Sequence, residues 1–177
     1  DGSGKVGVRD NLGFEGLTVS VDGREILLAT ENAVTQDGPR AGLAVGSPVR
    51  LLRLDRTTGE PVAQHLYLTD PIAAAPRPRS GFAVNGISSI LALDGRRVLV
   101  LERSYSDGVG VAVRLFEADL DGATDVGSLP SLDGANVTPV AKRLLLDFGN
   151  FGVPLDNYEG LAWGAPRSDG KRTLLVV

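Results

Sequence analysis

Residues 11–31 of the chain read NLGFEGLTVSVDGREILLATE, and two later stretches repeat the same pattern. Residues 85–103 read NGISSILALDGRRVLVLER, and residues 157–177 read NYEGLAWGAPRSDGKRTLLVV. Each copy consists of an apolar run, an Asp-Gly pair, a basic residue and a second apolar run. The copies begin at intervals of 74 and 72 residues. Internal similarity at a regular spacing indicates an architecture built from repeated units.

Within each copy the pattern is that of antiparallel strands. An Asp-Gly pair between two apolar runs is a hairpin signal, and no stretch shows a clear 3.6-residue period with helix caps. Runs rich in Val, Leu and Ile, separated by Gly, Pro and Asp, predict the following strands: 16–21, 25–31, 48–55, 62–69, 87–93, 98–105, 109–119, 140–148, 159–164 and 173–177.

Four sequential antiparallel strands per repeat predict an all-β fold, a partial β-propeller of about two and a half blades of four-stranded sheets. We expect blades at about 11–70 and 85–148 and half a blade at about 157–177, within one domain over 1–177. Because a closed propeller needs about four to eight blades, we expect either a longer parent chain that supplies the remainder, or self-association or another partner that covers the open surface.

Composition excludes several classes of function. The net charge of −4 and the scattered basic residues argue against nucleic-acid binding. No apolar run reaches the length of a membrane span. The single His and the absence of Cys argue against a zinc site or a Ser-His-Asp relay within this chain. With no Met and a bacterial-looking composition, we expect a processed, extracytoplasmic protein, secreted or periplasmic.

The three copies together resemble the phytase-like family, described as "esterase-like activity of phytase". The matching residues are GFEGL at 13–17, SVDG at 20–23, GIS at 86–88, LVLER at 99–103 and NYEGLAW at 157–163. The resemblance covers about 11–177, although members of the family generally begin earlier and continue past the third phrase. It implies a β-propeller that hydrolyses a small-molecule phosphate ester or other ester.

Two carboxylates occupy equivalent places in the first and third copies. Glu15 and Glu159 each precede Gly-Leu at the start of a first strand, where the second copy has Ser88. The first strand of a propeller blade lines the central channel, and carboxylate oxygens suit Ca²⁺ or Mg²⁺. Similar Glu-Gly starts hold a divalent cation in gluconolactonase-type propellers. The alternative is that each Glu accepts backbone N–H bonds and ties neighbouring blades together.

Charged residues also end the second strands of the first two copies. Glu31 ends the second strand of the first copy, and we expect it to be a third metal ligand. Glu102 and Arg103 end the second strand of the second copy and are our candidate catalytic residues, since an Arg can fork onto phosphate or carboxylate oxygens. Alternatively, Arg103 forms an internal ion pair, with Glu102 or with a carboxylate of the next blade.

The sequence therefore favours a hydrolase that uses Ca²⁺ or Mg²⁺ to cleave a phosphate ester or other ester. Two alternatives remain. One is a lactonase-like metal-dependent hydrolase on the same architecture. The other is a non-catalytic propeller that binds a sugar, a peptide or an envelope partner. Fold alone does not choose among these functions.

Overall fold

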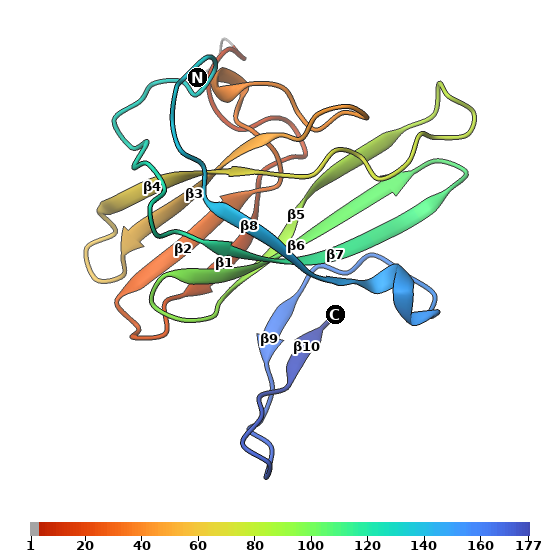
Figure 1. Ribbon diagram of the computed structural model, residues 1–177. Helices are drawn as coiled ribbons and strands as arrows, with labels where there is room; N and C mark the ends of the chain where they lie inside the picture. Colours follow the sequence, from red (N-terminus) through yellow and green to blue (C-terminus); the bar gives the residue numbers. More distant parts are fainter. Residues whose placement is uncertain (1–3) are drawn as a thin grey trace.

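The computed structural model describes residues 4–177, so the first three residues of the expected domain lie outside this range. The described chain contains ten strands and two short 3-10 turns, and no α-helix occurs between residues 4 and 177 (Figure 1). The all-β prediction is therefore confirmed. Within the same residues, no helix is long and apolar enough to cross a bilayer.

The strands form three antiparallel sheets, and strand order follows chain order in the two large ones. The first sheet contains β1 (Phe14–Val19), β2 (Glu25–Thr30), β3 (Pro48–Asp55) and β4 (Pro61–Leu68). The second contains β5 (Ala83–Ala92), β6 (Arg97–Ser106), β7 (Gly110–Asp119) and β8 (Ala141–Asp147). The third pairs β9 (Leu161–Trp163) with β10 (Leu174–Val176), and the 3-10 turns are η1 (Thr35–Asp37) and η2 (Phe148–Phe151).

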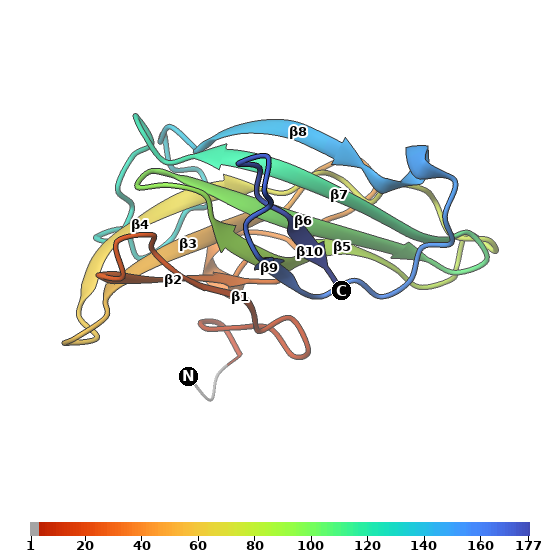
Figure 2. The same ribbon diagram turned by 90° about the horizontal axis from the view of Figure 1, so that it is seen from below.

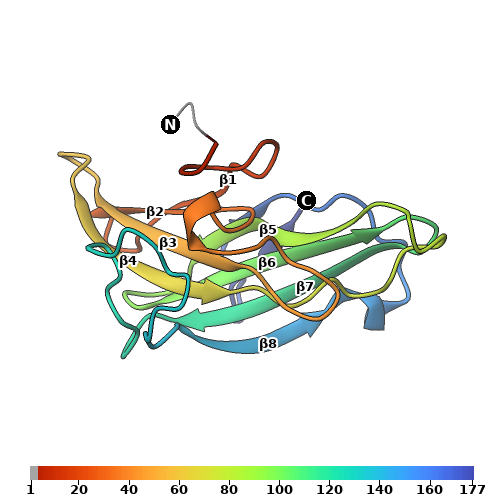
Figure 3. The same ribbon diagram turned by 90° about the horizontal axis from the view of Figure 1, so that it is seen from above.

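The two large sheets share one apolar core. Side chains from β2, β3 and β4 pack against side chains from β5, β6 and β7, among them Leu51, Tyr67, Ile90 and Val100. The other face of the second sheet packs against β9 and β10, which Figure 2 shows in front of it. Figure 3 shows β8 at the far edge of that sheet from the N-terminus. None of the three sheets closes or curls upon itself, so the propeller is not confirmed.

Strand β6 shows how the sequence produces this double packing. Successive side chains of a strand point to opposite faces. Val98 and Val100 accordingly belong to the core shared with the first sheet, whereas Leu99 and Leu101 pack toward β9 and β10. The almost unbroken apolar run in β6 reflects burial on both faces, as expected for a sheet covered on both sides.

Two strands begin at least two residues earlier than predicted. Strand β1 starts at Phe14 rather than at residue 16, and β5 starts at Ala83 rather than at residue 87. In β5, Ala83 and Val84 pair with Ser106 and Tyr105 across the sheet. The prediction failed there because Asn-Gly at 85–86 has the composition of a turn, although the structure places both residues inside the strand.

The connection at 121–139 has a buried part that its polar composition did not indicate. Val126 and Leu132 pack against Leu66 of β4. The backbone N–H groups of Val126 and Val140 donate to the carbonyls of Gln64 and Leu66. This segment therefore covers the edge of β4, which protects an otherwise open sheet edge.

Candidate functional site

The same backbone irregularity recurs at the start of each sheet. The pairing of β1 with β2 skips Glu15, and the pairing of β5 with β6 skips Ser88. Before β9, the N–H groups of Glu159 and Gly160 both donate to the Val177 carbonyl, at 2.7 and 2.9 Å. These are β-bulges or bulge-like pairings, which redirect a side chain and are frequent beside functional sites. The bulges put Glu15, Ser88 and Glu159 in equivalent places.

The bulges also show which residues of the second strands, β2 and β6, are equivalent. Phe14 pairs with Thr30 just before one bulge, and Ile87 pairs with Glu102 just before the other. Thr30 and Glu102 are therefore equivalent, and so are the residues that follow them, Glu31 and Arg103. The first and second sheets thus carry a carboxylate and a guanidinium at matching positions.

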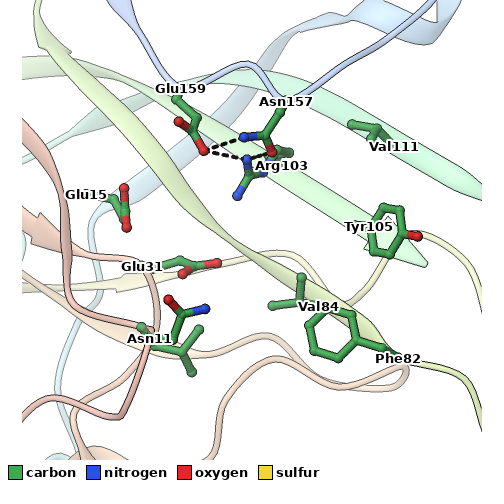
Figure 4. Close-up of a pocket in the computed structure, with 11 residues that line it drawn as sticks. Asn11, Glu15, Glu31, Phe82, Val84, Arg103, Tyr105, Val111, Asn157 and Glu159 are labelled. Carbon is green, nitrogen blue, oxygen red and sulfur yellow. Dashed lines mark hydrogen bonds and ion pairs between the residues drawn. The ribbon is translucent and has the colours of Figure 1, made fainter. Parts of the chain in front are cut away.

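A pocket of about 330 Å³ lies beside these positions, and Ser88 is the one bulge residue that does not line it. Four of the five candidate site residues line it, namely Glu15, Glu31, Arg103 and Glu159 (Figure 4). The remaining lining residues are Asn11, Leu12, Phe82, Val84, Tyr105, Val111 and Asn157. The volume is at the lower end of the range for small-molecule sites, roughly 300–1,000 Å³.

Arg103 is held at the wall of the pocket by the segment that precedes β9. Its Nη1 lies 2.9 Å from Glu159 Oε1 and also donates to Asn157 Oδ1. The Asn157 side-chain amide donates to the same Glu159 oxygen at 2.5 Å. The Glu159 side chain is 54% exposed, and ion pairs in contact with solvent are worth only about 0–1 kcal/mol. Only the Glu159 member of this pair is well exposed, since the Arg103 side chain is 18% exposed, and a ligand oxygen can replace Glu159 as the partner of Arg103.

Glu31 is packed at the contact between the two large sheets. Its backbone N–H donates to the Gly13 carbonyl at 2.7 Å, and its own carbonyl accepts from Ile87 at 3.0 Å. Gly86 makes this approach possible, because a Cβ at that position would lie 2.5 Å from Glu31 Cγ. Burial raises the pKa of the Glu31 carboxyl. Arg103 opposes this shift, whereas the negative charges of Glu15 and Glu159 add to it.

Glu102, the other candidate catalytic residue, does not line this pocket. It points from β6 toward the first sheet, as strand alternation requires for the neighbour of Arg103. Only 2% of the residue is exposed. Its carboxylate accepts bonds from the Tyr67 hydroxyl at 2.7 Å, the Asn85 side-chain amide at 2.9 Å and Lys142 Nζ at 2.6 Å.

Further contacts complete the surroundings of Glu102. The backbone N–H of Asp70 donates to its carboxylate at 2.8 Å, and the Asp70 carboxylate accepts from Lys142 Nζ at 2.7 Å. Lys142 Nζ also lies 4.0 Å from the centre of the Phe116 ring, within range of a cation–π contact. The buried charge of Glu102 is thus matched by a cation and by three hydrogen-bond donors.

Sequence reasoning missed several residues around these charges. Asn85 and Asn157 each bond a charged residue of β6, Glu102 and Arg103 respectively. The available signal was that an Asn begins every copy of the repeat. Lys142 had no such signal, because it lies 40 residues from Glu102 and on a different strand.

The pocket has the oxygen chemistry of a divalent-cation site but is not a ready-made one. Carboxylate and amide oxygens suit Ca²⁺ and Mg²⁺. Among residues 4–177, however, no three Asp, Glu, His or Cys side chains are grouped closely enough to hold a metal ion. Burial is the main cause of the raised pKa of Glu31, and the negative charges of Glu15 and Glu159 add to it.

A comparison with protein families identifies one match. The family model described as "esterase-like activity of phytase" matches residues 1–177, the whole chain. No curated protein and no solved structure matches the chain.

Proposed function

The chain belongs to the phytase-like family, and from this premise we propose that it hydrolyses an ester bond in the pocket of Glu15, Glu31, Arg103 and Glu159. One observation carries the proposal: three carboxylates and one guanidinium, from the three sheets and the segments beside them, line a single cavity. A cavity that gathers ionisable groups, one of them with a shifted pKa, is a typical setting for acid–base chemistry.

Three residues of the pocket have different roles in the proposed reaction. Arg103 is the group that binds and orients the ester oxygens and stabilises the negative charge that develops on them. Glu31 is the group that exchanges a proton, because it is the pocket carboxyl whose pKa is raised by burial. Asn157 holds the Arg103 guanidinium toward the cavity.

Glu15 and Glu159 are the residues that would hold a Ca²⁺ or Mg²⁺ ion in this proposal. When bound, the ion supplies Lewis-acid stabilisation of the substrate oxygens. The bulges at both residues support this role, since they redirect equivalent side chains toward the same space.

We also infer that the three sheets are successive blades of a β-propeller, with blades at about 11–70 and 85–148 and part of a third at about 157–177. Three features support this inference: the sequential strand order, the face-to-face packing of successive sheets, and the bulge at the same place in each. In such a propeller the pocket would lie at the end of the first strands, near the central axis.

The test measures stability and turnover on the same samples. A Ca²⁺ or Mg²⁺ concentration tenfold above Kd adds about 1.4 kcal/mol to the free energy of unfolding. This corresponds to a rise in Tm of roughly 3–6 °C for a chain of this size. We expect this rise in the unaltered protein and not in Glu15→Gln.

Hydrolysis of p-nitrophenyl phosphate and p-nitrophenyl acetate should fall at least about tenfold in Glu15→Gln and in Arg103→Lys, a loss of about 1.4 kcal/mol in transition-state stabilisation. The control is Glu60→Gln, which changes an exposed carboxylate outside the pocket. Unchanged turnover in both pocket variants, with no effect of either cation on Tm, would contradict the proposal and favour a non-catalytic binding protein.

A further inference from the structure

The pocket has a second end that the proposed chemistry does not use, formed by two exposed aromatic rings. Phe82 precedes β5 and Tyr105 lies near the end of β6, and they are 54% and 38% exposed. Their ring centroids are 6.3 Å apart and their planes are inclined by 35°. Figure 4 shows both rings at the end of the cavity away from Glu15 and Glu159.

These two rings are held in place by the sheet. Tyr105 pairs with Val84 across β5 and β6. The Phe82 N–H donates to the Asp107 carboxylate at 2.7 Å, and the Asp107 N–H donates to the Phe82 carbonyl at 2.9 Å. The same carboxylate also lies close enough to the Tyr105 hydroxyl to raise the pKa of that phenol. The rings therefore form a fixed apolar wall.

The charge of the cavity restricts what can lie against this wall. Glu15, Glu31 and Glu159 outnumber Arg103, whose guanidinium is already bonded to Glu159. A polyanion entering the cavity without a cation would meet net repulsion, because like charges at close range cost free energy in a partly buried site. Hydroxyl groups meet no such penalty, since carboxylates accept their hydrogen bonds and Arg103 donates to their oxygens.

We propose that this pocket binds an uncharged sugar or polyol ring, with the C–H face of the ring on Phe82 and Tyr105 and its hydroxyls toward Glu31, Arg103 and Asn157. Such a ring has one apolar face and a polar edge, which matches a cavity with one aromatic wall and one charged wall. The substrate class is then a neutral sugar or polyol ester. This inference rests on the proposed ester hydrolysis, and it narrows the substrate.

The experiment is saturation-transfer NMR in EDTA, with three probes: methyl β-D-glucopyranoside, myo-inositol and myo-inositol hexakisphosphate. We expect transfer to the uncharged rings, strongest at their C–H protons, and none to the hexakisphosphate. Phe82→Ala and Tyr105→Ala should each weaken binding about three- to tenfold, the range expected for loss of one aromatic contact.

Two further variants keep the test specific. Phe151→Ala removes an exposed ring outside this pocket and should leave binding unchanged. Phe82→Leu keeps apolar volume without a ring and should bind more weakly than the unaltered protein. Phe82 and Tyr105 are both exposed, so their truncation should leave Tm nearly unchanged.

Three results would overturn the inference. They are no transfer to either uncharged ring, binding by Phe82→Ala and Tyr105→Ala that is as tight as binding by the unaltered protein, or binding of the hexakisphosphate without a cation. A fourth is Phe82-dependent binding of phenyl acetate without any sugar binding, which would indicate an aromatic ester instead. Because the readout is binding, the two proposals fail separately. Ring binding without ester turnover contradicts only the proposed function, and turnover without ring binding contradicts only this inference.

Discussion

Two regions of the molecule use the same kinds of charged residue in opposite ways, and they meet at consecutive positions of β6. Glu102 faces the contact between the two large sheets, where a cation and three hydrogen-bond donors satisfy its carboxylate. Arg103 faces the open pocket, where its partners Glu159 and Asn157 are exposed. One residue step along a strand thus separates a buried structural ion pair from a ligand-accessible cation.

Two of the buried carboxylates sharpen this comparison. Glu102 and Glu31 are both buried. The burial of Glu102 is matched by Lys142 at 2.6 Å. Glu31 has only the opposing influence of Arg103, and burial together with neighbouring carboxylates raises its pKa. The pocket therefore differs from the contact between the two large sheets in that the charge of its buried carboxylate, Glu31, is not fully compensated. Such a pattern is expected of functional sites.

The largest effect should come from removing the cation of the buried pair. Lys142→Met leaves Glu102 and Asp70 without their ammonium partner, and breaking a buried pair on one side costs about 3–5 kcal/mol. We expect this loss in the free energy of unfolding, measured by urea denaturation.

The matched control for Lys142→Met is Arg143→Met. Arg143 is the next residue of β8, and its ion pair with Glu117 is largely exposed on the arginine side. Its removal should cost about 0–1 kcal/mol. Equal small losses in the two variants would mean that the pair around Glu102 is no more structural than a surface contact.

A smaller loss should follow from removing one hydrogen bond to Glu102. Tyr67 is fully buried and its hydroxyl donates to Glu102 at 2.7 Å. Tyr67→Phe should cost about 1.5–3 kcal/mol, the value for hydrogen bonds to charged groups. Tyr158→Phe, in a partly buried ring packed on Phe148, serves as control and should change urea stability far less. A Tyr67→Phe protein as stable as the original would contradict the role of this contact.

The smallest effect should be a gain in stability when the pocket residue Glu31 is changed. The native state binds the Glu31 proton more tightly than the unfolded state does, because the pKa is raised. This tighter binding of the proton contributes to the free energy of unfolding. The contribution is fully present below the ordinary pKa of 4.5 and is lost as pH rises through the pKa of the native state. Glu31→Gln removes the charge, so it should raise Tm by a few degrees at neutral pH.

Thermal melts across pH check the Glu31 prediction. The gain from Glu31→Gln should shrink as pH falls and vanish below 4.5, where Glu31 is protonated in both states. The exposed Glu60→Gln variant should show no such pH-dependent gain. A Glu31→Gln protein that is less stable at neutral pH would place Glu31 with Glu102, as a satisfied structural carboxylate.

Sequence reasoning located the strands better than the contacts between them. Alternating and continuous apolar runs revealed the strands, because side-chain period depends only on local backbone geometry. The sequence-based prediction placed the start of β5 too late. Asn-Gly at 85–86 is typical of turns, and only the neighbouring sheet makes a strand favourable there. The equivalence of Glu15 and Glu159 came from the repeat itself, before any bulge was visible.

The direction of each charge was harder to predict than its position. Glu102 and Arg103 were both expected at one site, and strand alternation sends them to opposite faces. Phe82 and Tyr105 gave no signal, since neither belongs to a motif and they meet only through pairing of β5 with β6.

By itself, the sequence determined the all-β class, the repeated hairpins and the carboxylates at the strand starts, because these depend on residue type and spacing along the chain. Only the tertiary structure decided which charges are compensated. Lys142 and Glu102 are neighbours although far apart in sequence, and Glu15, Glu31, Arg103 and Glu159 share a cavity through the packing of three sheets. The physical reason is that desolvation and Coulomb interaction depend on distance in space, so a charge becomes structural or functional through what folding brings against it.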